Sequence, residues 1–428
     1  MAERSRVVIL GGGFAGMGVA QELARLLPHR RDCDITLVDQ NNFSLFTPML
    51  TEVASGLVEP EGIVAAIRSL EPRVTFEQGC VECIDPAARR VTISVGDGLS
   101  GVGPVRRTLE ADHLVIALGS VTNFHGIPGL QDHSLTIKSV GDARAIRNRA
   151  VGLLERADEE SDSGARRSLL TFVVGGGGFS GIETVAALND LVRDLVDRFP
   201  NVRRDDVRTV VVQPGGRILP ELSEGLARYT QKELERRGVE VLLNTEVSGA
   251  GPDYVEIKEA KGQTSRRIET HTIIWAGGVT PSPAIDTAGL KLGHHHGIVV
   301  DSCCRVPGHT DIWALGDCAE IPKPGSSKTY APTAQNAIRE GPLVARNIVA
   351  GMRGEPLTPF EYRSIGELAI VGKRTGVASV YGFHFKGLIA WAMWRAIYLA
   401  KLPRMPRRIQ VGMDWLLDLA FGRDTVEL

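Results

Sequence analysis

Residues 6–16 read RVVILGGGFAG, a short apolar run that passes directly into a glycine-rich turn. A continuous apolar run of this length is typical of a strand that is buried on both faces of a parallel sheet. Gly11, Gly13 and Gly16 have the G-x-G-x-x-G spacing, and a helical pattern follows them. A second apolar run, ITLVD over 35–39, ends in an acid. This order of strand, glycines, helix and strand predicts a Rossmann-like unit that binds a dinucleotide.

Each part of this unit has a physical role. The first glycine permits a tight turn, the second lets the backbone approach a pyrophosphate, and the third lets the helix pack on the sheet. The N–H groups and dipole at the helix N-terminus favour the phosphates, and the acid accepts hydrogen bonds from ribose hydroxyls. We therefore expect this dinucleotide to be bound by Gly11, Gly13, Phe14, Ala15, Gly16 and Asp39.

The same device recurs in LLTFVVGGGGFSG over 169–181, and the strand 209–212 that follows ends in Gln213. An uncharged residue at this position repels a 2′-phosphate less than a carboxylate would, so discrimination against NADPH should be weaker. Arg217 either assists such a phosphate or is simply solvated. A chain with two dinucleotide units is typical of a hydride relay. The residues expected to bind NADH or NADPH here include Gly176, Gly178, Phe179, Gly181 and Gln213.

Length and composition limit the alternatives. A chain of 428 residues is too long for one ordinary core, so two or three domains are expected. The formal net charge of −2 gives no sign of a nucleic-acid partner. The six cysteines show neither zinc spacing nor a disulfide framework, which favours a reducing cytosol. We see no secretory signal and no run of 18 apolar residues, so a transmembrane helix is not expected.

Three further segments carry a family resemblance. The stretches LVIALG (114–119), IIWAGG (273–278) and DIWALGDCA (311–319) resemble the two-dinucleotide-domain flavoprotein disulfide reductase superfamily. The resemblance implies that Asp317 binds the ribityl chain of FAD. It also implies that Gly119 lies at the exit of the FAD domain and Gly277 at the exit of the NAD(P)H domain.

Within that superfamily, the chain most resembles the type II NADH:quinone oxidoreductases, which are single-subunit dehydrogenases that do not pump protons. The four stretches that carry the likeness are NNFSLFTPMLTEVASG (41–56), GGGGFSGIETVAAL (175–188), YAPTAQNAIREG (330–341) and the C-terminal segment 387–421. The likeness therefore extends over essentially the whole chain.

This resemblance implies roles for particular residues. Asn42 and Ala334 would lie beside FAD, Gln335 would serve both FAD and a membrane quinone, and Glu183 would orient the nicotinamide or relay protons. The sequence departs from the family pattern at Gln213, where the family usually has Glu, and at Arg339, which replaces the second glutamine of the AQxAxQ quinone motif. Arg339 could donate to a quinone carbonyl or could reshape the pocket.

The C-terminal segment has the composition of a membrane-surface region. Residues 386–408 hold six Lys and Arg and no Asp or Glu, and the tryptophans at 391, 394 and 415 lie in the same part of the chain. The apolar run 388–400 is too short to span a bilayer. It fits helices that lie in the interface of an anionic membrane, and the alternative is a dimer interface or packing on the core.

Three further motifs are interpreted as structural rather than functional. The pair Cys80 and Cys83 lies in a strand-like stretch far from the expected flavin, so a redox disulfide is not expected. The histidine run 294–296 lies between glycines and predicts a solvated turn rather than a metal site. The charged, serine-rich segment 158–167 predicts a flexible surface connection.

The sequence therefore predicts an α/β fold with two Rossmann-like dinucleotide-binding domains plus a C-terminal membrane-associated helical region. The expected limits are 1–118 and 295–354 for the FAD domain, 119–294 for the NAD(P)H domain, and 355–428 for the membrane-associating and dimerisation region. The expected cofactors are FAD and NADH or NADPH, with no metal. The expected partners are a membrane quinone, the membrane surface and a second copy of the chain, at the cytoplasmic face of the cell membrane.

Three other activities remain open from the sequence. One is a soluble reductase of a protein electron carrier such as ferredoxin or rubredoxin. Another is an enzyme similar to the sulfide:quinone oxidoreductases. The third is a non-catalytic redox sensor that is attached to the membrane and binds both nucleotides.

Overall fold

The computed structural model describes residues 4–28, 33–96, 103–259, 262, 265–423 and 426–427. The chain forms two compact units, each assembled from separate segments. The first comprises 1–45, 64–121 and 279–364, and the second comprises 46–63, 122–278 and 365–428. The domain limits expected from the sequence stay a prediction. These units differ from them by grouping 46–63 and 365–428 with the segment that carries the second glycine motif.

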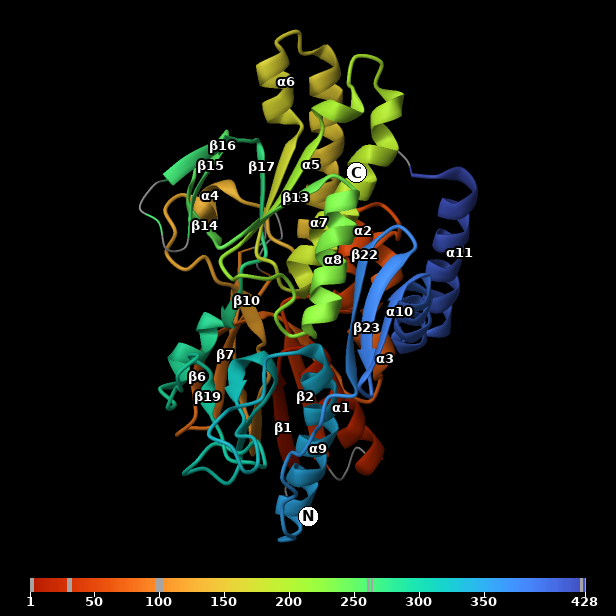
Figure 1. Ribbon diagram of the computed structural model, residues 1–428. Coiled ribbons are helices and arrows are strands. Elements are labelled where there is room, and N and C mark those ends of the chain that lie inside the picture. Colours follow the sequence, from red (N-terminus) through yellow and green to blue (C-terminus); the bar gives the residue numbers. More distant parts are fainter. Residues whose placement is uncertain are drawn as a thin grey trace. The chain divides into compact units, whose positions relative to one another are not determined.

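The first unit is built on a five-stranded parallel sheet in the order β20-β9-β1-β2-β5 (Figure 1). Val7, Ile9 and Leu10 of β1 are fully buried, as expected for a strand covered on both faces. The bounds of the sheet strands and of its two long helices are β1 Ser5–Leu10, β2 Cys33–Asp39, β5 Thr75–Gln78, β9 His113–Ile116, β20 Ile312–Ala314, α1 Phe14–Leu26 and α9 Ala334–Met352.

Smaller elements complete this unit. An antiparallel sheet of β6, β7 and β8 contains Cys80 and Cys83, which confirms the strand expected there. The bounds are α3 Ile67–Leu70, β3 Phe43–Leu45, β4 Val64–Ala66, β6 Cys80–Asp85, β7 Arg90–Val95, β8 Val105–Glu110, β18 Val279–Pro281, β19 Ile298–Val299 and β21 Ala319–Glu320. The chain passes into the second unit within β10 (Ser120–Thr122).

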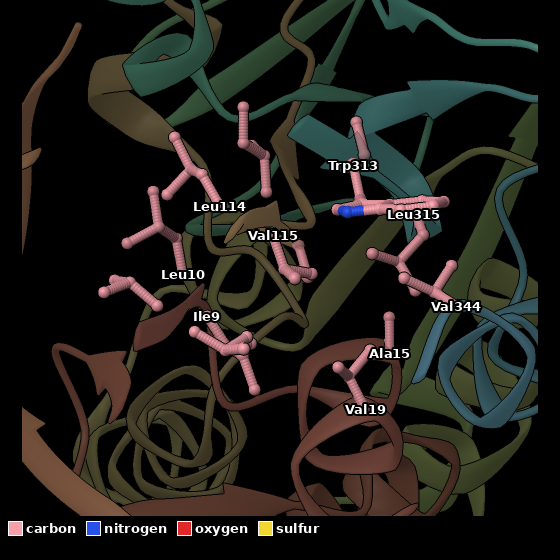
Figure 2. Packing of buried hydrophobic residues seen from close by; sticks show 14 of the residues in the cluster. Ile9, Leu10, Ala15, Val19, Leu114, Val115, Trp313, Leu315 and Val344 are labelled. Atoms are coloured by element: carbon pink, nitrogen blue, oxygen red, sulfur yellow. The ribbon is translucent and has the colours of Figure 1, made fainter. Parts of the chain in front are cut away.

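The core of the first unit lies between its sheet and its helices. Figure 2 shows Ile9 of β1, Leu114 of β9, Trp313 of β20 and Val344 of α9 gathered in one apolar cluster. The Trp313 side chain is 1% exposed, so the C-terminal return of the chain completes the core begun by β1. Burial of these side chains contributes about 1.5–3 kcal/mol each.

The second unit repeats the same plan with a four-stranded parallel sheet in the order β13-β12-β11-β17. The helix after the glycine turn begins at Phe179. The bounds of its central elements are β11 Thr171–Gly175, β12 Arg208–Gln213, β13 Val239–Leu243, β17 Thr272–Trp275, α7 Phe179–Leu195 and α8 Glu224–Arg236.

Helices and a small antiparallel sheet surround that centre. Their bounds are α2 Leu50–Ala54, α4 Leu130–His133, α5 Val140–Glu159, α6 Ser163–Leu169, β14 Thr245–Ala250, β15 Tyr254–Glu259 and β16 Ser265–Glu269. The flexible connection expected at 158–167 is wrong, because α5 and α6 occupy most of it. Asp162 accepts a hydrogen bond from the Ala165 N–H at 2.7 Å, which caps α6 and outweighs the helix-breaking composition.

The C-terminal part of the second unit is a three-stranded antiparallel sheet followed by two helices: β22 Gly366–Gly372, β23 Thr375–Val380, β24 Phe383–Gly387, α10 Leu388–Lys401 and α11 Met405–Phe421. None of the helices in the described ranges is both long and apolar enough to cross a membrane. Two of the three C-terminal tryptophans pack on the core, which the sequence left open as the alternative to a membrane surface. Trp394 is fully buried and Trp415 is 7% exposed, because both fill the space between the helices and the rest of the unit.

Candidate dinucleotide sites and a buried acid

The glycine turn of the first unit has the shape of a phosphate cradle. Gly11 has a φ of +104°, and a Cβ on it would lie 2.2 Å from the Ala117 carbonyl oxygen. A Cβ on Gly16 would lie 1.8 Å from the Gly11 carbonyl oxygen, whereas one on Gly13 would have no atom within 4 Å. The first turn of α1, which includes Phe14 and Ala15, has no acidic residue and no side-chain cap. Its N–H groups are therefore available to an anion.

Asp39 holds this turn in place. Its Oδ2 accepts the Gly12 N–H at 2.6 Å, and its Oδ1 accepts the Asn41 N–H at 2.7 Å. Burial raises the pKa of the Asp39 carboxyl above its ordinary value, although both hydrogen bonds act to lower it. The carbonyl of the adjacent Asn42 accepts the Ile67 N–H at 3.0 Å, so this end of the sheet is firmly braced.

A second acidic position in the first unit follows β20. Ser120 donates to Oδ2 of Asp317 at 2.7 Å, close to the turn at Gly119. Gly316, which has a φ of +72°, donates its N–H to Oε2 of Glu340 at 2.7 Å. Glu340 is 2% exposed, and burial raises its pKa to about 7. Sequence reasoning missed Glu340, because a lone glutamate inside a helical pattern resembles a surface residue.

The motif that resembles the quinone motif lies in the first turns of α9, just after Ala334. Oε1 of Gln335 accepts the Tyr362 hydroxyl at 3.1 Å. Arg339 donates to the Gln335 carbonyl at 2.6 Å, and its guanidinium lies 4.1 Å from the centre of the Tyr362 ring. The structure thus joins Gln335 and Arg339 through Tyr362, which the sequence did not single out. Arg339 also lines a groove of about 640 Å³ on this unit.

The second glycine turn repeats the geometry of the first. A Cβ on Gly176 would lie 2.6 Å from the Ala276 carbonyl oxygen, and one on Gly181 would lie 1.9 Å from the Gly176 carbonyl oxygen. A Cβ on Gly178 would again have no atom within 4 Å. The first turn of α7, beginning at Phe179, has no acidic residue and no side-chain cap. A cavity of about 700 Å³, which we call the dinucleotide cradle, opens over Gly176, Gly178 and Gly277.

In the dinucleotide cradle, Gln213 stands at the position that Asp39 occupies in the first unit. Its Oε1 accepts the Gly177 N–H at 2.8 Å, so the side-chain carbonyl braces the turn and the amide N–H groups remain as donors. Lys258 also lines the cradle and forms an ion pair with Glu246 at 2.9 Å. Arg217 donates to the Pro220 carbonyl at 2.5 Å. Lys258 is therefore a cation at this site that the sequence did not indicate.

Trp275 is a structural determinant of the cradle wall. Its Nε1 donates to the Asn123 carbonyl at 2.7 Å. A Cβ on Gly175 would lie 2.5 Å from the indole, and one on Gly277 would lie 2.2 Å from it. His125, with a φ of +51°, lies 3.2 Å from the Gly277 carbonyl through its Nε2. The glycines on both sides of the ring are explained by its size.

Glu183 does not line the dinucleotide cradle. It lines a smaller cavity of about 40 Å³ in the same unit, together with Glu52, Arg395 and Arg423. Its Oε1 accepts the Ile370 N–H of β22 at 3.0 Å. Burial raises the pKa of Glu183 to about 8. Such a carboxyl holds its proton at neutral pH, which is the property of a group that can deliver a proton.

The histidine run forms the exposed turn that the sequence predicts. His294, His295 and His296 are exposed in a turn, and no group of three or more possible metal ligands occurs in the described ranges. Cys80 and Cys83 are free thiols. Cys318 is fully buried, and burial raises the pKa of its thiol to about 12, so it is not a nucleophile.

Comparison with known proteins identifies the family. The pyridine nucleotide-disulphide oxidoreductase family matches residues 5–341, and the NDH2 C-terminal domain matches 365–424. A probable NADH dehydrogenase of Dictyostelium discoideum is 30% identical over 99% of this chain and 91% of its own length. The type II NADH:quinone oxidoreductase NdhA of Mycobacterium tuberculosis is 30% identical over 96% of this chain and 86% of its own.

A solved structure shows the same fold. The structure of NDH2 from Plasmodium falciparum in complex with NADH has a TM-score of 0.88 at 20% identity, and covers 99% of this chain and 100% of that chain. The expected α/β fold with Rossmann-like sheets is confirmed. The chain belongs to the type II NADH:quinone oxidoreductase family of the pyridine nucleotide-disulphide oxidoreductases.

Proposed function

We propose that this chain is an FAD-dependent NADH dehydrogenase that oxidises NADH, or NADPH, and reduces a membrane quinone without pumping protons. The observation that carries the proposal is the repeated cradle. Two strand–glycine–helix turns have the same close approaches and the same open middle glycine. Two such turns in a chain of this family fit FAD in the first unit and the nicotinamide nucleotide in the second. Bound FAD supplies a carrier that accepts a hydride and releases two electrons.

The residues of the chain then have separable roles. In the first unit, Gly13 and the first turn of α1 would receive the pyrophosphate of FAD, and Asp39 and Asp317 would bind its ribose and ribityl hydroxyls. In the second unit, Gly178 would receive the nucleotide pyrophosphate. Gln213 and Lys258 would face the adenosine ribose, and their donors suit either a hydroxyl or a 2′-phosphate.

Membrane attachment is supported by the outer face of α10 and α11. Val411 and Trp415, four residues apart, face inward. The exposed apolar residues of the two helices are Leu388, Ile389, Met405, Ile409, Met413, Leu416, Leu417, Leu419 and Phe421. The cations Lys401, Arg404, Arg407 and Arg408 lie in the same stretch. This amphipathic pattern favours peripheral binding to an anionic bilayer, at the cytoplasmic face of the cell membrane.

A second copy of the chain is the other possible occupant of that face, as the sequence already indicated. A homodimer that leaves part of the face uncovered would present a joint membrane surface. Co-sedimentation with anionic vesicles, combined with the oligomeric state in detergent, separates these cases. Binding by the native chain that is lost in the I409S/L416S/F421S variant would support membrane attachment. A variant that still binds vesicles but changes from dimer to monomer would assign the face to the dimer.

The central experiment is steady-state oxidation of NADH and NADPH by the FAD-loaded protein, with and without a short-chain quinone. Quinone-dependent turnover would support both halves of the reaction. Flavin that is bleached by NADH but not reoxidised by quinone would refute the quinone half, and a protein electron carrier would then be the acceptor. Nucleotide binding without turnover would support the alternative function of a non-catalytic redox sensor.

A further inference from the structure

The small cavity beside Glu183 is lined by an unusual concentration of charge. It lies between α2, α7, β22, α10 and α11, and we call it the polar chamber: the space bounded by Glu52, Glu183, Asp190, Arg395, Asp418 and Arg423. Its lining shares no residue with the dinucleotide cradle. The residues come from segments that are far apart in the sequence, so the chamber is a product of the fold rather than of one motif.

The two carboxyl oxygens of Glu52 differ in their hydrogen bonding. Oε2 accepts the Trp415 Nε1–H at 2.6 Å, which joins α2 to α11. Oε1 has no hydrogen-bond partner among the described residues, and Nη2 of Arg395 lies 3.6 Å away. The two side chains are 5% and 12% exposed, so this gap is shielded from bulk solvent. A separation of this size between opposite charges is suited to a bridging water.

Arg423, which also borders the polar chamber, is another buried charged group with polar atoms that lack hydrogen-bond partners in the described part of the chain. The Arg423 side chain is 3% exposed, and its Nε and Nη1 have no hydrogen-bond partner in the described part of the chain. Its nearest carboxylates, Asp194 and Asp418, lie at 3.6 and 4.0 Å. Buried polar atoms almost always find partners, and a cavity of about 40 Å³ has room for ordered water. The polar chamber is therefore built to hold water in contact with several charged groups.

Two of the four carboxyls of the chamber, Glu52 and Glu183, interact through their charges. Burial, with a smaller contribution from the charge of Glu52, raises the pKa of Glu183 to about 8. Burial also raises the pKa of Glu52, while Arg395, the Trp415 N–H and Arg423 lower it and Asp418 raises it. Helix α5 contributes Arg147, which lies against Gly56 just beyond the end of α2. With its pKa raised to about 8, Glu183 holds a proton at neutral pH, beside a second buried carboxyl.

The proposed reaction needs such a proton. NADH delivers a hydride, which carries two electrons and one proton, and a quinone takes two electrons and two protons to become a quinol. The balance is NADH + H⁺ + quinone → NAD⁺ + quinol, so each turnover draws one proton from solution. Glu183 is the carboxyl that the family resemblance associates with proton relay, and the structure gives it a second carboxyl as a neighbour across the polar chamber.

We propose that Glu52 is a proton-handling residue for quinone reduction, and that the polar chamber connects it to Glu183 through ordered water. Glu183 gives up the proton that quinone reduction consumes and recovers one from Glu52. The pair is refilled from solution where the exposed Lys373 borders the chamber. This inference rests on the proposed function. It adds a residue that no motif singled out, and it gives Glu52 a task beyond anchoring α11.

The first test measures protonation without catalysis. Infrared titration of the full-length protein follows the carboxylic-acid C=O band of the native chain, Glu52→Gln, Glu183→Gln and the double variant. We expect Glu52→Gln to remove one titrating band and to shift the Glu183 titration to lower pH, because the charge of Glu52 is gone. A Glu183 titration that is the same with and without Glu52 would overturn the coupling.

The second test separates proton handling from anchoring. Trp415→Phe removes the hydrogen bond to Glu52 but keeps the carboxyl, whereas Glu52→Gln keeps an oxygen to accept that bond. We expect Glu52→Gln to slow quinone reduction by about 10- to 100-fold, to change its pH profile and to leave flavin reduction by NADH unchanged. Trp415→Phe should keep the Glu52 ionisation in the pH profile but move it to higher pH, because the N–H that lowers the pKa of Glu52 is gone. Equal effects of the two variants would assign Glu52 a structural role only.

Failure of the proposed function is distinguishable from failure of this inference. If the native chain does not reduce quinone, the proposed function is wrong. If the native chain does so and Glu52→Gln has its rate and pH profile, the role of Glu52 is wrong.

Discussion

The two open middle glycines allow binding to be separated from folding, and Gly178→Ala is the sharpest case. Gly178 has φ −77° and ψ −174°, an extended conformation that alanine adopts without strain. A Cβ there would meet no atom within 4 Å. The substitution should therefore leave stability unchanged or raise it by about 0.4–1 kcal/mol, since alanine restricts the unfolded chain. The added methyl group instead fills space that the pyrophosphate would use.

The expected loss of affinity can be bounded. Displacing the phosphates from the N–H groups of α7 removes one or two charge-assisted hydrogen bonds, each worth about 1.5–3 kcal/mol. A loss of about 2–3 kcal/mol corresponds to a roughly 30- to 150-fold weaker Kd for NADH. The FAD content should stay native, because the glycine turn of the first unit is unchanged.

Calorimetric titration with NAD⁺ and the rate of flavin reduction at varied NADH would measure this loss, with thermal unfolding as the check on folding. Gly181→Ala is the matched control within the same turn. Its Cβ would lie 1.9 Å from the Gly176 carbonyl oxygen, so it should disrupt folding itself. Native NADH affinity in a well-folded Gly178→Ala variant would show that the pyrophosphate does not bind over this turn.

Three further predictions concern single side chains. Gln213→Glu keeps an acceptor for the Gly177 N–H but adds a charge, so kcat/KM for NADPH should fall by about 10- to 100-fold while that for NADH is retained, as steady-state rates would show. Glu340→Ala leaves the partly buried Gly316 N–H without its acceptor, at a cost of about 1 kcal/mol, and should weaken FAD retention more than Glu340→Gln does, measured by flavin fluorescence. The pKa of Glu183 is raised to about 8 in the folded state, so the folded chain binds more protons than the unfolded chain between about pH 4.5 and 8. Stability is thus lost as pH rises through this window, by up to ~1.4 kcal/mol per pH unit, and denaturant unfolding of Glu183→Gln should lack that loss.

Both glycine turns could be predicted from the sequence, because the residues that define each turn are close together in the chain. The strand, the three glycines and the helix lie within about 20 residues of one another, and each glycine has a steric reason that depends on its immediate neighbours. Gly11 and Gly176 confirm this, since both take positive φ at the same place in the motif. The braces at Asp39 and Gln213 lie at the end of the adjacent strand, where the parallel sheet must place them.

The residues that sequence reasoning missed depend on distant contacts. Glu52 lies 363 residues from Trp415, and the composition around 41–56 gives no sign that this acid is buried. Arg395 was counted among the membrane-facing cations, but it pairs with Glu52 and is 12% exposed. Helical periodicity alone cannot choose which face of α10 turns inward, because the segment is apolar almost all round.

The inward orientation of Arg395 changes how the C-terminal helices should be understood. Removing one partner of a buried ion pair leaves an uncompensated charge, which typically costs about 3–5 kcal/mol, whereas replacing both by apolar groups is often neutral. Glu52→Ala should therefore destabilise the second unit more than the double change Glu52→Leu with Arg395→Met. If the double variant is as stable as the native chain, packing alone does not explain this charge pair. The contact of Glu52 with the polar chamber supplies an explanation, because a hydrophobic pair would hold α10 and α11 equally well but could not exchange a proton with Glu183.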